Sequence, residues 1–118
     1  MAAAADYYSP EFVDHVNAME FHGLDGVRRS VALYQELFPD LSFAVDDQVA
    51  EDSRVASRWT LHGSHRGRHV RLTGITISRF ENGRIIEDWG ATDTIALIRQ
   101  LGVWRSLLLL MRHRKLLW

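Results

Sequence analysis

Apolar residues recur at helical spacing between residues 24 and 38, and four strand-like runs follow. The helical run ends before Pro39 and contains Val27, Val31, Leu33, Tyr34, Leu37 and Phe38. The strand-like runs cover residues 42–50, 54–62, 69–80 and 84–91, with turn residues between them. One helix followed by a meander of strands predicts an α+β fold.

Shorter elements are expected at both ends of this pattern. The alanine-rich residues 2–8 predict a short helix that Ser9-Pro10 ends, and residues 11–15 predict a tight turn or a single helical turn. Residues 94–101 predict a short closing helix with Asp93 or Thr94 as its N-cap.

Asn82-Gly83 lies between two apolar runs and predicts a hairpin, because a type I′ turn needs positive φ at both central residues. The turn therefore pairs the last two strands. On the period of two of the final strand, Asp88 shares a face with Gly90, while Glu87 and Trp89 share the other.

Composition bounds the fold and the function. The chain has 118 residues, 47% of them hydrophobic, which suits one domain with its own core. Residues 1–60 carry 11 acidic and 4 basic side chains, and residues 61–118 carry 4 and 10. This balance lacks the basic excess of a nucleic-acid binder. There is no cysteine for a disulfide or a thiolate metal site. The start lacks the pattern of a secretion signal, so we expect a cytoplasmic protein.

The final residues, 103–118, differ from the rest. Apolar residues 107–111 form a run too short to span a bilayer, which takes about 20 residues, and basic side chains surround it. We expect an amphipathic tail that packs on the domain 1–102 or on a dimer partner. A helix lying on an anionic membrane is the alternative, and it is not favoured.

Two residues are candidates for acid–base catalysis. His65 lies in G-S-H-R-G, where glycines let a ligand approach the backbone and a histidine can move a proton near neutral pH. Asp88 would have a raised pKa suited to a general base if its face of the strand lines a pocket. Each also has a structural reading, as a hydrogen-bonded histidine and as a partner of Arg79 or Arg84.

Other side chains predict the pocket walls rather than the chemistry. Candidates are Phe12, Asp14, His15, Tyr34, Trp59 and Trp89. His62 and His69 lie near His65, but strand alternation turns His62 and His65 to opposite faces. No metal-ligand spacing is present, so no metal site is predicted.

Several segments together resemble the SnoaL-like polyketide cyclase family. In order they are Y-Y-S-P-E-F-V-D-H, G-L-D-G-V, F-P-D-L, R-V-A-S-R-W-T-L-H-G-S-H-R-G, G-I-T-I-S-R-F-E-N-G-R-I-I-E-D-W-G-A-T-D and R-Q-L-G. The resemblance covers residues 6–102. It implies a cone-like α+β barrel in which a curved, mostly antiparallel sheet wraps helices around one deep apolar pocket. It also implies a homodimer and a cofactor-free aldol ring closure run by an aspartate with a histidine and a glutamine.

The chain departs from the family at its catalytic positions. Counted from Asn82-Gly83, the aspartate position falls on Gly90, and the histidine and glutamine positions fall on Thr76 and Gly74. The loop after Gly67 is shorter than in the family, and the first helix is missing or reduced. Asp88, one strand period before Gly90, is the nearest substitute for the base, and Thr76 joins the predicted pocket wall.

Two functions follow from these observations. The first is a cofactor-independent cyclase, isomerase or lyase acting on an apolar polyketide- or terpenoid-like molecule, with Asp88 as base and His65 as proton donor or orienting group. The second is a non-catalytic binding or dimerising member of the same fold, favoured by the missing catalytic side chains. An epoxide-opening enzyme would need an Asp-Arg-Asp arrangement, and Arg58 is followed by Trp59-Thr60, which disfavours it.

Overall fold

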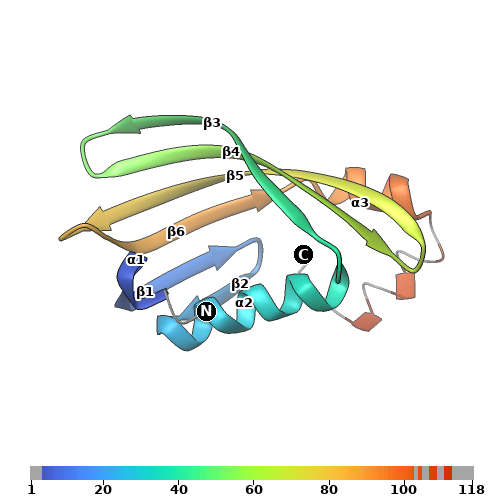
Figure 1. Cartoon of the computed structure of the whole chain (residues 1–118), viewed down its shortest axis with the longest axis horizontal. Coiled ribbons are helices and arrows are strands. Elements are labelled where there is room, and N and C mark those ends of the chain that lie inside the picture. The colour runs from blue at the N-terminus through green and yellow to red at the C-terminus, as the bar shows by residue number, and fades with distance from the viewer. Residues whose placement is uncertain (1–3, 103, 105–106, 109–110, 113–118) are drawn as a thin grey trace.

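The computed structural model describes residues 4–102, 104, 107, 108, 111 and 112. Between residues 4 and 101, three helices and six strands follow one another (Figure 1). They are α1 (Ala4–Tyr7), β1 (Tyr8–Val16), β2 (Met19–His22), α2 (Gly23–Leu37), β3 (Ser42–Glu51), β4 (Arg54–His65), β5 (Arg68–Glu81), β6 (Arg84–Thr92) and α3 (Thr94–Leu101). The predicted α+β class, the long helix, the four strands and the closing helix are confirmed.

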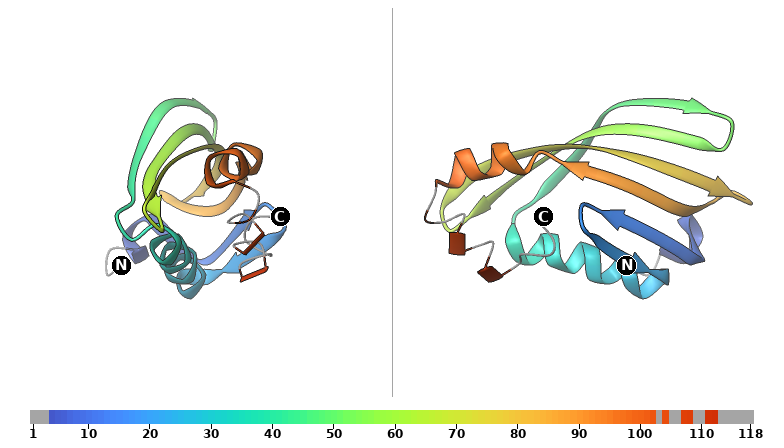
Figure 2. Two further views of the ribbon diagram at one scale, coloured as in Figure 1. Left: turned by 90° about the vertical axis from the view of Figure 1, so that its right-hand side faces the viewer. Right: turned by 180° about the vertical axis from the view of Figure 1, so that it is seen from behind.

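The six strands form a single curved sheet in the order β2-β1-β6-β5-β4-β3. Every pair of neighbours is antiparallel except β1 and β6, which run parallel. Figure 2 shows from the end how the sheet arches over α2, which lies on its concave side.

Local chemistry explains the elements that were predicted. Asn82 and Gly83 have φ of 54° and 78°, as the expected turn between β5 and β6 requires. The side chain of Asp93 accepts a hydrogen bond from the backbone N–H of Ala96 at 3.1 Å, so Asp93 caps α3.

The prediction for residues 11–15 is wrong, because this segment belongs to strand β1. Pro10 does not end the chain's regular structure. It lies where the pairing between β1 and β6 is irregular, between Tyr8 and Val13. A proline is tolerated in a strand at such a position, where its missing N–H costs no ladder bond. Of the helix predicted over residues 2–8, the described residues Ala4–Tyr7 form α1, and Tyr8 already begins β1.

The main core fills the concave side of the sheet. Its buried members come from β1, β2, α2, β4, β5 and α3, together with the residue after α2, and are Val16, Phe21, Leu37, Phe38, Trp59, Leu61, Val70, Leu72, Leu97 and Leu101. A smaller cluster, Ala4, Phe12 and Val27, lies between α1, β1 and α2. Burial of these apolar side chains holds the three helices α1, α2 and α3 against the sheet.

Most of the predicted tail, residues 103–118, lies outside the described residues, so its packing and the division at residue 102 stay predictions. Within the described part, Arg112 Nη2 lies 3.4 Å from Glu36 Oε1 on α2. No helix of the described residues has the length and apolar character needed to cross a membrane.

Candidate active site

A cavity of about 330 Å³ lies between the concave face of the sheet and α2. Its walls are mostly apolar, with two carboxylates at one side. The lining residues are Asp14, Val16, Ser30, Val31, Tyr34, Gln35, Leu41, Phe43, Trp59, Leu61, Thr76, Asp88, Gly90 and Thr92. This size and composition suit a small, largely apolar molecule.

The two carboxylates come from neighbouring strands. Asp14 on β1 stands opposite Asp88 on β6 in the parallel register, and both side chains reach the cavity. Asp88 retains only 8% of its surface exposed. Two acidic groups therefore face the same small apolar space, partly removed from water.

Burial and mutual repulsion change the acidity of this pair. Burial raises the pKa of Asp14, and the charge of Asp88 raises it further, to about 7, against a smaller lowering by His15. Burial also raises the pKa of Asp88, and a hydrogen bond from Ser78 opposes that shift. Asp14 thus keeps a proton to a higher pH than an ordinary carboxyl group, and a carboxyl group that exchanges its proton near neutral pH can serve as an acid or a base.

One oxygen of the pair is left for a ligand. Among the described residues, Asp88 Oδ1 has no hydrogen-bond partner although it is buried. A buried oxygen without a partner is unfavourable in a folded protein unless something else supplies the donor. The cavity is where that donor would come from.

Tyr34, Trp59 and Thr76 shape the wall beside the pair. The indole N–H of Trp59 donates to Thr76 Oγ1 at 3.0 Å, which fixes the indole ring. Burial raises the pKa of the Tyr34 hydroxyl, with a hydrogen bond to Thr92 opposing the shift and Asp14 adding to it. Tyr34 is therefore a neutral hydroxyl close to the carboxylates.

The structure places four of the predicted site residues away from the cavity. The ring of His65 donates from Nδ1 to the Leu37 carbonyl at 2.9 Å, at the end of β4, and Phe12 is buried in the smaller cluster. His15 and Trp89 lie on the outer face of the sheet, where their rings stack with 5.7 Å between the ring centroids. His65 is thus held in a structural contact rather than near the carboxylates. The other five, Asp14, Tyr34, Trp59, Thr76 and Asp88, line the cavity.

The sequence did not reveal the partnership of Asp14 with Asp88, because β1 was not recognised as a strand. It also missed further wall residues, which are Ser30 and Gln35 on α2, Leu41 in the loop after α2, and Phe43 on β3. The helical period of α2 could have indicated Ser30 and Gln35, since they lie on either side of Val31 and Tyr34.

His62 and His69 lie side by side on the paired strands β4 and β5, and His62 Nδ1 is 3.4 Å from His69 Nε2. Within the described part of the chain, no group of three or more histidine, cysteine, aspartate or glutamate side chains could hold a metal ion.

The family model described as SnoaL-like polyketide cyclase matches residues 1–101. The chain belongs to the SnoaL-like polyketide cyclase family. No curated protein matches it. The family assignment agrees with the fold, in which a curved sheet encloses a cavity against a helix.

Solved structures of similar proteins support this SnoaL-like fold. IdmH from Streptomyces antibioticus, a candidate polyketide cyclase, is 25% identical with a TM-score of 0.77, and the match covers 86% of each chain. TsrD from Streptomyces laurentii is 27% identical with a TM-score of 0.76, over 86% of this chain and 81% of that one. AclR from Streptomyces galilaeus, a candidate hydroxylase, is 25% identical with a TM-score of 0.71, over 82% and 79%.

The three positions to which the resemblance assigns the family's catalytic side chains, Gly90, Thr76 and Gly74, have different surroundings in the structure. Gly90 and Thr76 line the cavity, and a Cβ built on Gly90 would have Thr76 Oγ1 as its nearest neighbour at 3.6 Å. At Gly74 the space of a side chain is taken by the ring of Trp59. The carboxylates of this cavity are therefore Asp14 and Asp88, at other positions.

Proposed function

We propose that this chain is a cofactor-independent cyclase or isomerase that performs acid–base chemistry on an apolar polyketide- or terpenoid-like molecule. The observation that carries the proposal is the pair of Asp14 and Asp88 in an apolar cavity. In this proposal Asp88 is the carboxylate and Asp14, whose pKa is raised to about 7, is the carboxylic acid, and pairs of this kind divide the roles of base and acid.

Asp88 acts as the base in this proposal. Its carboxylate removes a proton from a carbon next to a carbonyl group, and the electron pair moves onto the carbonyl oxygen as an enolate. The carboxyl of Asp14 and the hydroxyl of Tyr34 donate to oxygen atoms of the substrate. In place of His65, Asp14 is the proton donor, because it lines the cavity.

Ring closure and isomerisation follow from the same start. In a ring closure the enolate carbon bonds to a second carbonyl carbon, and that oxygen takes the proton of Asp14. In an isomerisation the proton held by Asp88 returns to a different carbon. The cycle is completed when a proton passes between the carboxyl groups or through water, so neither reaction requires an oxidant or a reductant.

Proton exchange at carbon tests the first step without knowledge of the natural substrate. β-Tetralone in deuterated buffer is an apolar ketone with exchangeable α-hydrogens, and NMR follows their loss. We expect the protein to accelerate exchange by roughly 100-fold or more, the range of general base catalysis. Asp88→Asn should remove this acceleration, whereas Asp47→Asn, on the exposed strand β3, should keep it. Exchange by Asp88→Asn at the rate of the unaltered protein would contradict the proposal.

The second candidate is a member that binds a small molecule without transforming it. Gly90, Thr76 and Gly74 at the family's catalytic positions favour it. The same NMR samples distinguish the two, because a binding protein broadens or shifts the β-tetralone signals without accelerating their exchange.

We also propose that the chain forms a homodimer through the outer face of the sheet. Val49, Ile75, Ile77 and Trp89 are exposed there by 67, 52, 41 and 38% and define an outer apolar patch. On the same face, Arg58 Nη1 of β4 lies 3.8 Å from Asp46 Oδ2 of β3. A second copy related by a two-fold axis can therefore cover apolar residues and bring unlike charges together.

A further inference from the structure

We propose that His15 and Glu87 are positioning residues, which hold β1 against β6 on the outer face of the sheet directly behind Asp14 and Asp88. The inference rests on the proposed function and adds a way in which its acid–base pair is aligned and adjusted. Neither side chain lines the cavity, so both act through the strands that carry the carboxylates.

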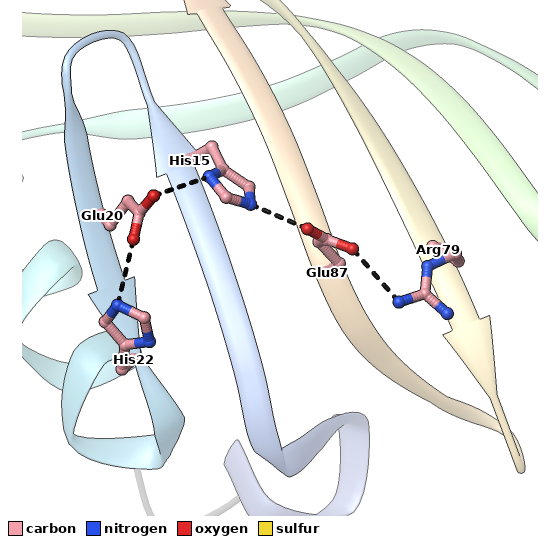
Figure 3. A network of polar contacts seen from close by, with 5 residues as sticks. All are labelled: His15, Glu20, His22, Arg79 and Glu87. Atoms are coloured by element: carbon pink, nitrogen blue, oxygen red, sulfur yellow. Dashed lines mark hydrogen bonds and ion pairs between the residues drawn. The ribbon is translucent and has the colours of Figure 1, made fainter.

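A continuous chain of polar contacts crosses four strands at this place (Figure 3). His15 Nε2 lies 2.8 Å from Glu87 Oε2, and Arg79 Nη2 donates to Glu87 Oε1 at 3.1 Å. On the other side, His15 Nδ1 lies 3.5 Å from Glu20 Oε1, and His22 Nε2 lies 3.2 Å from Glu20 Oε2. The link between His15 and Glu87 is the one that joins β1 to β6.

This link lies just beyond the irregular part of the pairing between β1 and β6. β1 and β6 are the parallel pair of the sheet, and their register is irregular before Val13. In the regular part, His15 follows Asp14 by one residue and Glu87 precedes Asp88 by one. Each link residue is thus the immediate neighbour of a carboxylate but points to the opposite face.

The two faces of the strand pair carry opposite interactions. On the inner face, Asp14 and Asp88 repel each other whenever both are charged, which would push the strands apart. On the outer face, His15 and Glu87 attract each other across the same strands. The ring of Trp89 stacks on His15 with an angle of 12° between the planes, and this contact restricts the histidine's rotation. The outer link therefore opposes the inner repulsion.

His15 is coupled to Asp14 by charge as well as by position. A positive charge on His15 lowers the pKa of Asp14, against the effects of burial and of Asp88. The groups that face Asp14 are Asp88 from β6, Tyr8 from β1 and Tyr34 from α2. Those that face His15 are Glu87 and Glu20.

Three variants separate alignment from charge. His15→Gln keeps a polar side chain that can reach Glu87 but carries no charge, and His15→Leu loses both. His22→Gln is the matched control, since His22 contacts Glu20 at the end of the chain of contacts and does not reach Glu87. The titration of Asp14 is read by NMR of its ¹³C-labelled carboxyl carbon, and catalysis by β-tetralone exchange.

We expect the titration midpoint of Asp14 to rise in both His15 variants and to stay unchanged in His22→Gln. Exchange at the optimum pH should fall about tenfold in His15→Leu and less in His15→Gln. An unchanged midpoint together with an unchanged rate in His15→Leu would overturn the proposal, as would equal effects of the His22 variant. The titration needs no turnover. If β-tetralone is not exchanged but the midpoint still moves, the proposed function fails while the coupling of His15 to Asp14 stands.

Discussion

Asp14 and Asp88 face each other across the parallel strands β1 and β6, and both reach one apolar cavity. Burial and the neighbouring charge of Asp88 raise the pKa of Asp14 to about 7, and burial raises the pKa of Asp88. The protonation of the pair therefore changes over a pH range that extends to about 7. This single relationship links the fold of the protein to its proposed chemistry.

The rate of β-tetralone exchange should depend on pH through both members of the pair. It should fall on the acid side as Asp88 gains a proton, and above about pH 7 as Asp14 loses one. Asp14→Asn cannot supply a proton, so we expect its rate to be lower by roughly 100-fold and its alkaline decline to vanish. Rates measured from pH 4 to pH 9 check this. A variant that kept the alkaline decline would assign that decline to another group.

The stability of the protein should depend on pH for the same reason. The pKa of Asp14 is raised in the folded state. Its contribution to the free energy of unfolding is therefore fully present below the unfolded pKa of 3.8 and is lost as pH rises through about 7. This change corresponds to about 4 kcal/mol at most, and partial contact with water reduces it. We expect Asp14→Asn to stabilise the protein by about 2 kcal/mol at pH 8.5 and by little at pH 3.5.

Urea unfolding of both proteins at the two pH values measures this difference. The matched control is Asp47→Asn, which removes an exposed carboxylate from β3 and should change stability similarly at both values. Greater stabilisation of Asp14→Asn at the acid pH would show that the pKa of Asp14 is not raised.

Local patterns in the sequence predicted strands β3 to β6 but neither β1 nor β2. Asn82-Gly83 fixed the β5–β6 hairpin, and alternation along β6 put Asp88 and Gly90 on one face. Strand β1 has no comparable signal, because Pro10 interrupts it and β6, the strand that brings Asp88 beside Asp14, lies more than 70 residues away in the chain. Parallel pairing between distant segments depends on the packed fold rather than on neighbouring residues. The base candidate was therefore predictable, while its partner Asp14 could be proposed only as a wall residue.

Two glycines of the cavity region should respond in opposite ways to alanine. A Cβ at Gly74 would overlap the Trp59 ring and lie 2.7 Å from the Ala91 carbonyl oxygen. Such overpacking typically costs about 1–3 kcal/mol, so we expect Gly74→Ala to be destabilised by this amount. At Gly90 the nearest atom to such a Cβ is 3.6 Å away. Gly90→Ala should therefore leave stability unchanged or raise it by up to about 1 kcal/mol, because alanine lowers the conformational entropy of the unfolded chain. Thermal unfolding of the pair provides the comparison, and equal melting temperatures would show that Trp59 does not fill the space beside Gly74.

The outer apolar patch predicts how the dimer should be broken. Ile77 is paired with Trp89 across β5 and β6 at the middle of that face. A lysine there would be buried without a partner in the interface, so Ile77→Lys should elute as a monomer where the unaltered protein has twice the mass of one chain. Ile95→Lys is the matched control, because Ile95 is also exposed, by 63%, but lies on α3 away from the patch. Light scattering after size-exclusion chromatography gives both masses. A dimer that survives Ile77→Lys, or dissociates equally in Ile95→Lys, would place the interface elsewhere on the molecule.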